Sequence, residues 1–396
     1  MGKTRQVNTG YIVAMCLVMY LIQGATSLIT PALAKLAENY SNYSASLVNL
    51  IVTIPSLSAI LGNLAFGRFI RIGYKKALCI GFAILIISAV APFFFVDNLI
   101  LVIATRAVVG VGFGLMFPAC TMTIIRTIAP EKQGSMMGFG NTFVAVALTL
   151  VYNMVPFLLN ISLSAVFLIH LVLLIPLLFV LPVPAKRFEL EEQPEAAQTN
   201  AASDTKQSFG VKSWFWQILI LFNILFYYPI CLYVSYVVAE IGGTTADAAI
   251  ASSVMSVAGA LGGAIFGIAI KTLQKRFMVA AFGMMALGFA LSAFTGSLLS
   301  LYAGCALIGI GNVLVITYSY SMIPQVTPVQ KVASANGNMS AFQNAGAFAS
   351  PILLSSISQM LGHGEVYQFS YVICTVFFVI GTIVFLFLGN RMTADN

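Results

Sequence analysis

Long runs of apolar residues, broken by short polar stretches, fill most of this 396-residue chain. A run of about 20 apolar residues crosses the hydrocarbon core of a membrane as a helix. Strands of a membrane barrel alternate over only about ten residues, whereas these runs are continuous and longer, so the pattern favours helices. It predicts twelve spans, at residues 11–33, 44–66, 77–96, 98–121, 136–158, 162–183, 213–238, 247–270, 277–297, 299–323, 333–357 and 366–389.

The composition agrees with a multi-pass, all-α membrane protein. Hydrophobic residues make up 60% of the chain and charged residues 8%, against about 25% charged residues in a soluble domain. The first apolar run is too long for the core of a typical signal peptide and no good cleavage site follows it, so we interpret it as a retained span.

The positions of the 19 lysines and arginines predict the orientation, because basic residues concentrate in cytoplasmic loops. With a cytoplasmic amino terminus, only Lys35 falls in an outer loop and only Arg106 falls inside a span. Twelve spans then place both termini in the cytoplasm. The outer loops are short, which favours a bacterial cytoplasmic membrane. The net charge of +7 follows from this distribution and needs no nucleic-acid partner.

Residues 185–212 form the only long polar stretch, rich in Glu, Gln, Ala and Ser. Such a composition cannot bury a hydrophobic core. We therefore predict a cytoplasmic linker between an N-terminal six-helix bundle, 1–184, and a C-terminal six-helix bundle, 213–396.

The two halves repeat. A shift of about 200 residues places glycines on glycines and basic loop ends on basic loop ends; the glycine pairs are Gly62 and Gly262, Gly67 and Gly267, Gly110 and Gly309, and Gly112 and Gly311. Parallel repeats of this kind can be related by an axis along the membrane normal and enclose a midplane cavity, which opens to alternate sides as one bundle rocks on the other.

Three segments carry a resemblance to the major facilitator superfamily that covers nearly the whole chain. They are GRFIRIGYKK (67–76), RAVVGVGFG (106–114) and APEKQGSMMG (129–138). The resemblance implies that family's fold, with twelve transmembrane helices in two pseudo-symmetric bundles. It also implies a conformational or gating role for the loop and glycine residues of the first two segments: Gly67, Arg68, Arg71, Gly73, Lys75, Gly110 and Gly112.

Two departures from the family pattern limit this resemblance. The first segment lacks the usual aspartate, which the charge pairing that latches one conformation in the family requires. The Gly-Pro-rich motif of drug/proton antiporters is not evident at 138–157, which weakens that subclass.

Arg106 is the one charged residue inside a span. At the centre of a helix an arginine costs about 2.5–3.5 kcal/mol on insertion scales. Arg106 follows Asp97 by nine residues, so it lies about 13 Å below the outer end of its helix. No carboxylate is predicted at that depth. Either the guanidinium binds a solute carboxylate with two hydrogen bonds, which we favour, or it bonds backbone carbonyls and amide side chains and braces its helix.

Further candidate solute-binding residues are polar or aromatic and lie on spans that the family places centrally or directly beside the central ones. They are Gln23, Asn141, Tyr227, Asn312, Tyr318, Gln343 and Asn344. The alternative for each is a hydrogen bond that only joins helices. Possible proton-coupling residues are His170, Glu38 and Glu240; a histidine within a span is otherwise an interior residue with its hydrogen bonds satisfied.

The predicted function is a secondary active or facilitative transporter that moves a small organic anion or amphipathic metabolite by alternating access. We expect a monomer in the lipid bilayer with a small-molecule substrate, no cofactor and no metal. The alternative is a proton-coupled multidrug efflux antiporter, and a non-transporting sensor is more remote. No nucleophile–base pair, metal cluster or pair of poised acids assembles, so an enzyme is excluded.

Overall fold

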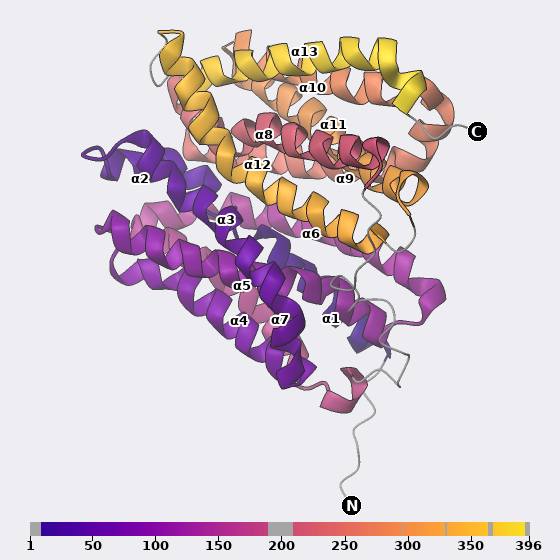
Figure 1. Ribbon diagram of the computed structural model, residues 1–396. Helices are drawn as coiled ribbons and strands as arrows, with labels where there is room; N and C mark the ends of the chain where they lie inside the picture. The colour runs from indigo at the N-terminus through magenta and orange to yellow at the C-terminus, as the bar shows by residue number, and fades with distance from the viewer. Residues whose placement is uncertain (1–8, 189–208, 295, 329–330, 363–366, 393–396) are drawn as a thin grey trace, which may run out of the picture. The chain divides into compact units, whose positions relative to one another are not determined.

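The computed structural model describes residues 9–188, 209–294, 296–328, 331–362 and 367–392 (Figure 1). These residues contain no β-strand, and every one of the twelve predicted spans coincides with helical structure. The all-α fold is therefore confirmed. Eight stretches are long and apolar enough to cross a membrane, and one of them, Thr245–Phe294, holds two consecutive helices.

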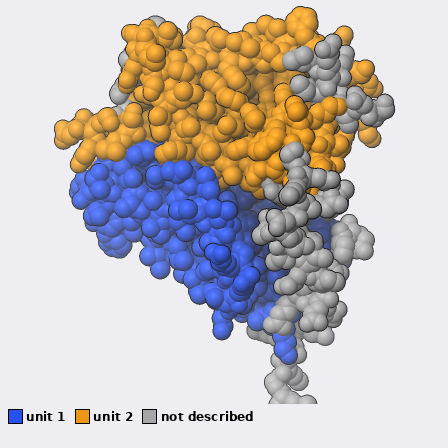
Figure 2. All heavy atoms as spheres, in the orientation of Figure 1, with its two compact units in different colours: residues 1–29, 50–193 blue, residues 30–49, 194–396 orange. Residues whose placement is uncertain are grey.

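The chain forms two compact units, coloured separately in Figure 2. Unit 1 comprises residues 1–29 and 50–193, and unit 2 comprises residues 30–49 and 194–396. Residues 30–49, which we call the 30–49 segment, thus pack with unit 2 although they precede most of unit 1 in sequence. The predicted linker, 185–212, lies mostly outside the described residues.

Unit 1 is built from helices and short 3₁₀ turns that follow one another closely. Its elements are α1 (Thr9–Met19), η1 (Tyr20–Gly24), most of α3 (Ala45–Phe69), η3 (Ile70–Ile72), α4 (Tyr74–Val90), η4 (Ala91–Phe94), α5 (Leu99–Thr127), α6 (Pro130–Ile161), η5 (Ser164–Leu173), α7 (Leu174–Val180) and η6 (Ala185–Phe188). The first span is not one continuous α-helix: α1 ends at Met19, and tight turns follow to residue 29.

Unit 2 contains six long helices besides the 30–49 segment, among the residues that the structure describes. Its elements are η2 (Thr30–Ala32), α2 (Leu33–Asn39), the start of α3, α8 (Val211–Glu240), α9 (Thr245–Leu273), η8 (Gln274–Arg276), α10 (Phe277–Phe294), α11 (Leu298–Val326), α12 (Val332–Met360) and α13 (Tyr367–Met392). Helices α10 and α13 lie side by side (Figure 1) and share an aromatic core, in which the rings of Phe289 and Phe378 stack 5.5 Å apart.

Glycines let pairs of helices approach closely in each unit, as small residues do in membrane bundles. In unit 1, a methyl group on Gly110 of α5 would overlap the backbone of Pro55 in α3. In unit 2, the repeat-related Gly309 of α11 lies in the same way against the carbonyl of Met255 in α9. The same kind of contact therefore recurs at matching positions of the two halves.

Large apolar side chains also cover the outside of the helices. Leu64, Phe157 and Phe387 are each more than 70% exposed. A lipid-facing surface needs such side chains, because the transfer of polar groups from water into hydrocarbon is unfavourable.

Two glycines of α3 provide a matched test of this packing. A methyl group on Gly62 would overlap the carbonyl oxygen of Val111 in α5, whereas Gly67 has nothing within 4 Å. We expect Gly62→Ala to lower stability by about 1–3 kcal/mol because the helices must separate. Gly67→Ala is expected to be neutral or slightly stabilising, since alanine is the better helix former.

Thermal unfolding of both variants in detergent measures this difference. Equal unfolding temperatures would show that α3 and α5 do not pack through Gly62.

Candidate functional site

Arg106 of α5 is completely buried in unit 1, with 0% of its surface exposed. Its Nε donates to the carbonyl oxygen of Ile51 at 2.8 Å, and one terminal nitrogen donates to the carbonyl oxygen of Thr26 at 2.6 Å. The other terminal nitrogen lies 3.2 Å from Nε2 of His170. All three guanidinium nitrogens are thus engaged by the protein itself.

The carbonyl of Ile51 is available to Arg106 because of Pro55. In an α-helix this oxygen would accept a hydrogen bond from the backbone N–H four residues later, and proline has no N–H. Residue 55 is a proline inside helix α3. The Arg106 side chain therefore supplies the donor that the helix lacks.

The second half of the chain has neither partner of this contact. The repeat aligns Pro55 with Met255 and Arg106 with Cys305. Met255 lies within the continuous helix α9, where its backbone N–H can donate to the carbonyl oxygen four residues earlier. Cys305 is buried and has no charged group. The proline and the arginine thus occur together in the first half, and both are missing at the matching positions of the second half. This is expected if the arginine supplies the donor that the proline removes.

His170 of η5 is also fully buried. Because arginine has no acceptor, Nε2 of His170 must accept from Arg106, and Nδ1, 3.0 Å from the carbonyl oxygen of Phe167, carries the proton. A second proton on this ring would lie against the guanidinium and break the contact. The pairing thus favours a neutral imidazole whose two ring nitrogens are both engaged.

Two other predicted residues of unit 1 come together. The Gln23 amide donates to the Asn141 side-chain oxygen at 3.4 Å, joining η1 to α6. Asn141 is exposed and Gln23 is half-buried, so amide atoms of the pair remain accessible to a solute.

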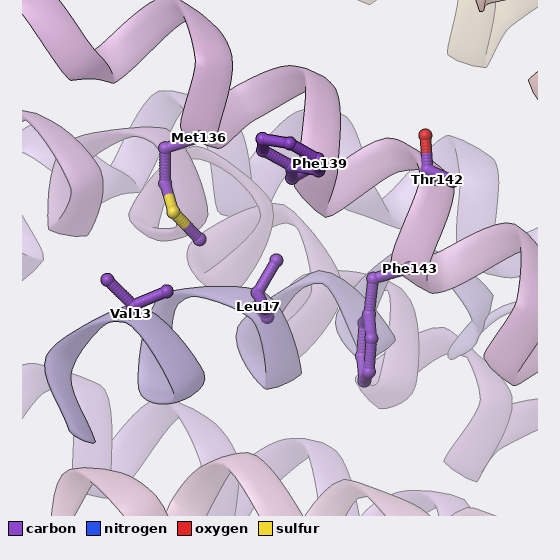
Figure 3. A pocket seen from close by; sticks show the side chains of 6 residues that line it. All are labelled: Val13, Leu17, Met136, Phe139, Thr142 and Phe143. Atoms are coloured by element: carbon purple, nitrogen blue, oxygen red, sulfur yellow. The ribbon is translucent and has the colours of Figure 1, made fainter. Parts of the chain in front are cut away.

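An apolar groove of about 280 Å³ lies between α1 and α6 (Figure 3). Its lining consists of Val13, Leu17, Met136, Phe139, Thr142 and Phe143. Only Thr142 carries a polar side-chain atom. The groove can therefore hold an apolar group, but it provides only one polar side chain to orient that group.

Unit 2 contains a buried amide pair between α8 and α11. The Asn223 amide donates to the Asn312 side-chain oxygen at 2.9 Å, and both residues are buried. The side-chain oxygen of Asn223 has no hydrogen-bond partner in the described residues. Tyr318, also predicted as solute-binding, instead lies in an aromatic cluster, 5.0 Å from the ring of Phe277 and 5.4 Å from that of Trp216.

A second polar group of unit 2 joins α11 to α12. The Gln343 amide donates to the Tyr320 hydroxyl at 2.7 Å, which lies 3.2 Å from the hydroxyl of Ser340. Asn344 donates to the carbonyl of Ser340 in its own helix, and the Tyr227 hydroxyl lies 3.8 Å from the sulfur of Met255. Gln343, Tyr320, Asn344 and Tyr227 are all half-buried.

The two acids that were predicted as possible proton-coupling residues, Glu38 and Glu240, lie at helix ends. Glu38 forms an exposed ion pair with Lys35, at 2.8 Å. Glu240 accepts from the backbone N–H groups of Tyr367 and Gln368 at the start of α13, the end of a helix at which a negative charge is stabilising. In the described residues no group of three or more His, Cys, Asp or Glu side chains could hold a metal.

The predicted gating residues divide into exposed loop ends and buried helix contacts. Gly67, Arg68 and Arg71 are exposed, and Gly73 has a φ of +103°, which favours glycine. Lys75 donates to the carbonyl of Leu181 at 2.6 Å, closing α4 onto the turn after α7. The buried pair lies on α5, with Gly110 against Pro55 and Gly112 against Leu85.

The partners of Arg106, namely the carbonyls of Thr26 and Ile51 and the ring of His170, were not predicted from the sequence. One signal was present: a proline within a predicted span leaves a carbonyl that some other donor must satisfy. The Arg126 contact was also missed; its guanidinium lies over the Tyr74 ring at 4.4 Å and donates to the carbonyl of Phe188 at 2.6 Å.

In the part of the chain that the structure describes, helices with eight stretches long and apolar enough to cross a membrane are typical of a multi-pass membrane protein. The family model of the Major Facilitator Superfamily matches residues 15–238 and 218–395. The chain belongs to this superfamily, and it is a transporter rather than an enzyme. No curated protein sequence matches it.

Solved transporter structures share the fold at low sequence identity. A bacterial homologue of the human lysosomal transporter Spinster, inward-facing and unoccupied, is 15% identical with a TM-score of 0.72, over 99% of this chain and 98% of that one. A D-xylose–proton symporter is 16% identical with a TM-score of 0.74, over 98% and 99%. The human organic anion transporter MFSD10 is 14% identical with a TM-score of 0.66, over 96% and 100%.

The buried asparagine pair makes a clear prediction for stability. Asn223→Leu or Asn312→Leu alone leaves a buried amide without its partner, at an expected cost of about 1–3 kcal/mol. The double variant removes both groups, so it should cost less than the sum of the two single changes.

Chemical or thermal unfolding of the three variants measures this coupling. Strictly additive losses would mean that the two amides do not interact.

Proposed function

We propose that this protein is a secondary transporter that carries a small amphipathic organic solute across a bacterial cytoplasmic membrane by alternating access. The observation that carries the proposal is the set of accessible amide and hydroxyl groups on the spans predicted to be central. They are Gln23 with Asn141 in unit 1, and Gln343 with Tyr320 and Asn344 in unit 2.

Amide and phenol side chains both donate and accept hydrogen bonds. They suit a solute with hydroxyl, amide or carboxylate groups on an apolar body. Organic anions stay within this class, since amide N–H groups also donate to carboxylates. Arg106 does not contribute a direct solute contact in this proposal, because its three nitrogens already bond the protein.

The mode of transport that we propose is facilitated diffusion or exchange rather than strict proton coupling. Glu38 and Glu240, the two acids considered for proton coupling, lie at helix ends, and Nε2 of the buried His170 ring is occupied by Arg106. The distribution of lysine and arginine supports cytoplasmic termini, and we expect the protein to act as a monomer.

Proton coupling can be measured directly. We expect solute uptake into proteoliposomes that contain a pH-sensitive dye to leave the lumenal pH unchanged. A pH change that follows uptake in fixed proportion would overturn uncoupled transport, and a shift in drug susceptibility on overexpression would then favour the proton-coupled multidrug antiporter, the alternative predicted from the sequence.

Two glutamines of α12 provide a matched test of the proposed solute contact. Gln343 bonds Tyr320, whereas Gln359 is exposed near the end of the same helix, 3.5 Å from Ser355. We expect Gln343→Leu to raise the solute KM by about tenfold, the loss of one hydrogen bond of about 1.4 kcal/mol.

Gln359→Leu should leave the KM unchanged. The solute is first identified by a thermal-shift screen of carboxylates, sugars, nucleosides and amphipathic drugs. Equal KM values for both variants would remove Gln343 from the solute site.

A further inference from the structure

The apolar groove between α1 and α6 lies entirely within unit 1 (Figure 3). Val13 and Leu17 line it on the α1 side, and Met136, Phe139 and Phe143 line it on the α6 side. Met136 is buried, whereas Phe139 is 69% exposed, so the groove is open along α6. None of its six lining residues is charged. The groove therefore suits a hydrocarbon group.

The groove lies between a closed helix contact and a basic residue. At the closed contact, the ring of Tyr20 lies so near Gly140 that a methyl group on this glycine would overlap it. Lys132 precedes Met136 by four residues, so both side chains lie on one face of α6. Lys132 is exposed. A positive charge is thus located one helical turn before the groove, about 6 Å along the axis.

The face of α6 that lines the groove stays apolar beyond it. Val146 and Phe157 follow Phe139 by seven and eighteen residues, which is the spacing of one helix face, and both are more than 50% exposed. Asn141 is two residues from Phe139 and therefore lies on the opposite side of the helix. The groove is thus continuous with the exposed apolar surface of α6 and separate from the amide group proposed to contact the solute.

The matching seam of unit 2 is closed by hydrogen bonds. The repeat aligns Leu17 with Gln217 and Phe139 with Asn338. Asn338 donates to the side-chain oxygen of Gln217 at 3.0 Å, and the Gln217 amide donates to the Ser213 hydroxyl at 2.9 Å. Gln217 and Ser213 are completely buried. Two positions that line an open apolar groove in unit 1 thus bond each other directly in unit 2.

The lysine at the start of the helix differs between the halves in the same way. The repeat aligns Lys132 with Lys331. The Nζ of Lys331 lies 5.4 Å from the centroid of the Phe209 ring, which attracts its charge. Lys132 forms no ion pair with the side chains that the structure describes. An open groove and an exposed lysine therefore occur together in unit 1, as binding of a hydrocarbon chain with an anionic head would require.

We propose that this groove binds an anionic phospholipid of the surrounding membrane, with one acyl chain between α1 and α6 and the phosphate near Lys132. The acyl chain matches the uncharged lining, and the phosphate matches the lysine. The chain can continue over the exposed side chains of Val146 and Phe157, which extend the same apolar face. The distribution of basic residues predicts that α6 begins at the cytoplasmic side, so the lipid belongs to that leaflet.

Photo-crosslinking locates the lipid directly. Full-length protein is reconstituted in phosphatidylcholine vesicles that contain a small fraction of phosphatidylglycerol with a diazirine on one acyl chain, and the labelled peptides are identified by mass spectrometry. We expect the label to concentrate on α1 and on the first half of α6. Label spread evenly over the exposed apolar side chains of other helices, such as α13, would overturn the proposal.

The closed seam of unit 2 provides a variant that fills the groove. Leu17→Gln with Phe139→Asn introduces the pair of side chains that bond each other in unit 2. We expect groove labelling to fall at least fivefold, because the acyl chain no longer enters. Phe157→Asn, on the same face of α6 but outside the groove, should leave groove labelling unchanged. If the double variant does not fold, Val13→Trp fills the groove instead, and unchanged labelling in the folded variant would overturn the proposal.

The two aligned lysines test the head group. Native mass spectrometry of delipidated protein in detergent gives the Kd for each added lipid. We expect Lys132→Gln to raise the Kd for phosphatidylglycerol about fivefold, equivalent to the ~1 kcal/mol of a lysine near an anionic surface. The Kd for phosphatidylcholine with the same chains should not change, and Lys331→Gln should change neither value. Equal effects of the two lysine variants, or competition by excess free glycerol phosphate, would overturn a lipid site at Lys132.

Other occupants of the groove give different results. A higher solute KM in the variant with Leu17→Gln and Phe139→Asn, with unchanged lipid labelling, would make the groove part of the solute site. A dimer of the unmodified protein that is lost in this variant, again with unchanged lipid labelling, would make the groove an interface between two copies. Either result would overturn the proposal. The lipid measurements need no transported solute, so they stand if the proposed function fails.

Discussion

A charged group buried in a membrane protein must find hydrogen-bond partners inside the molecule, because neither lipid nor distant water can provide them. Arg106 meets this requirement with two backbone carbonyls and one imidazole. The arrangement depends on an exception in the neighbouring helix, since a regular helix would have used the carbonyl of Ile51 itself. A helix defect at Pro55 and a buried charge at Arg106 thus compensate each other.

The same requirement accounts for the other polar groups of the two units. Asn223 and Asn312 pair across α8 and α11, and the Gln343 amide bonds the Tyr320 hydroxyl across α11 and α12. The buried pair contributes to stability, while the half-buried groups keep hydrogen-bonding capacity for a solute.

The 30–49 segment belongs to unit 2 although it precedes most of unit 1 in the chain. It packs with unit 2 through buried apolar side chains and the bond between Asn49 and Tyr236, while the adjoining chain on both sides is bonded to Arg106 in unit 1. The bonds of Arg106 to these two backbone carbonyls do not depend on the identity of neighbouring side chains.

The apolar runs alone determined the number of spans and their helical nature, since a membrane leaves a long apolar segment no other low-energy structure. The buried depth of Arg106 and its need for a partner also followed from sequence. Only the tertiary structure decided which partner it has: the carbonyls of Thr26 and Ile51 are identical in chemistry to every other carbonyl of the chain. The carbonyl of Thr26 lies where the helix is broken after α1, and the carbonyl of Ile51 lacks a helical donor because of the proline in α3. Only the folded chain places both carbonyls next to the guanidinium of Arg106.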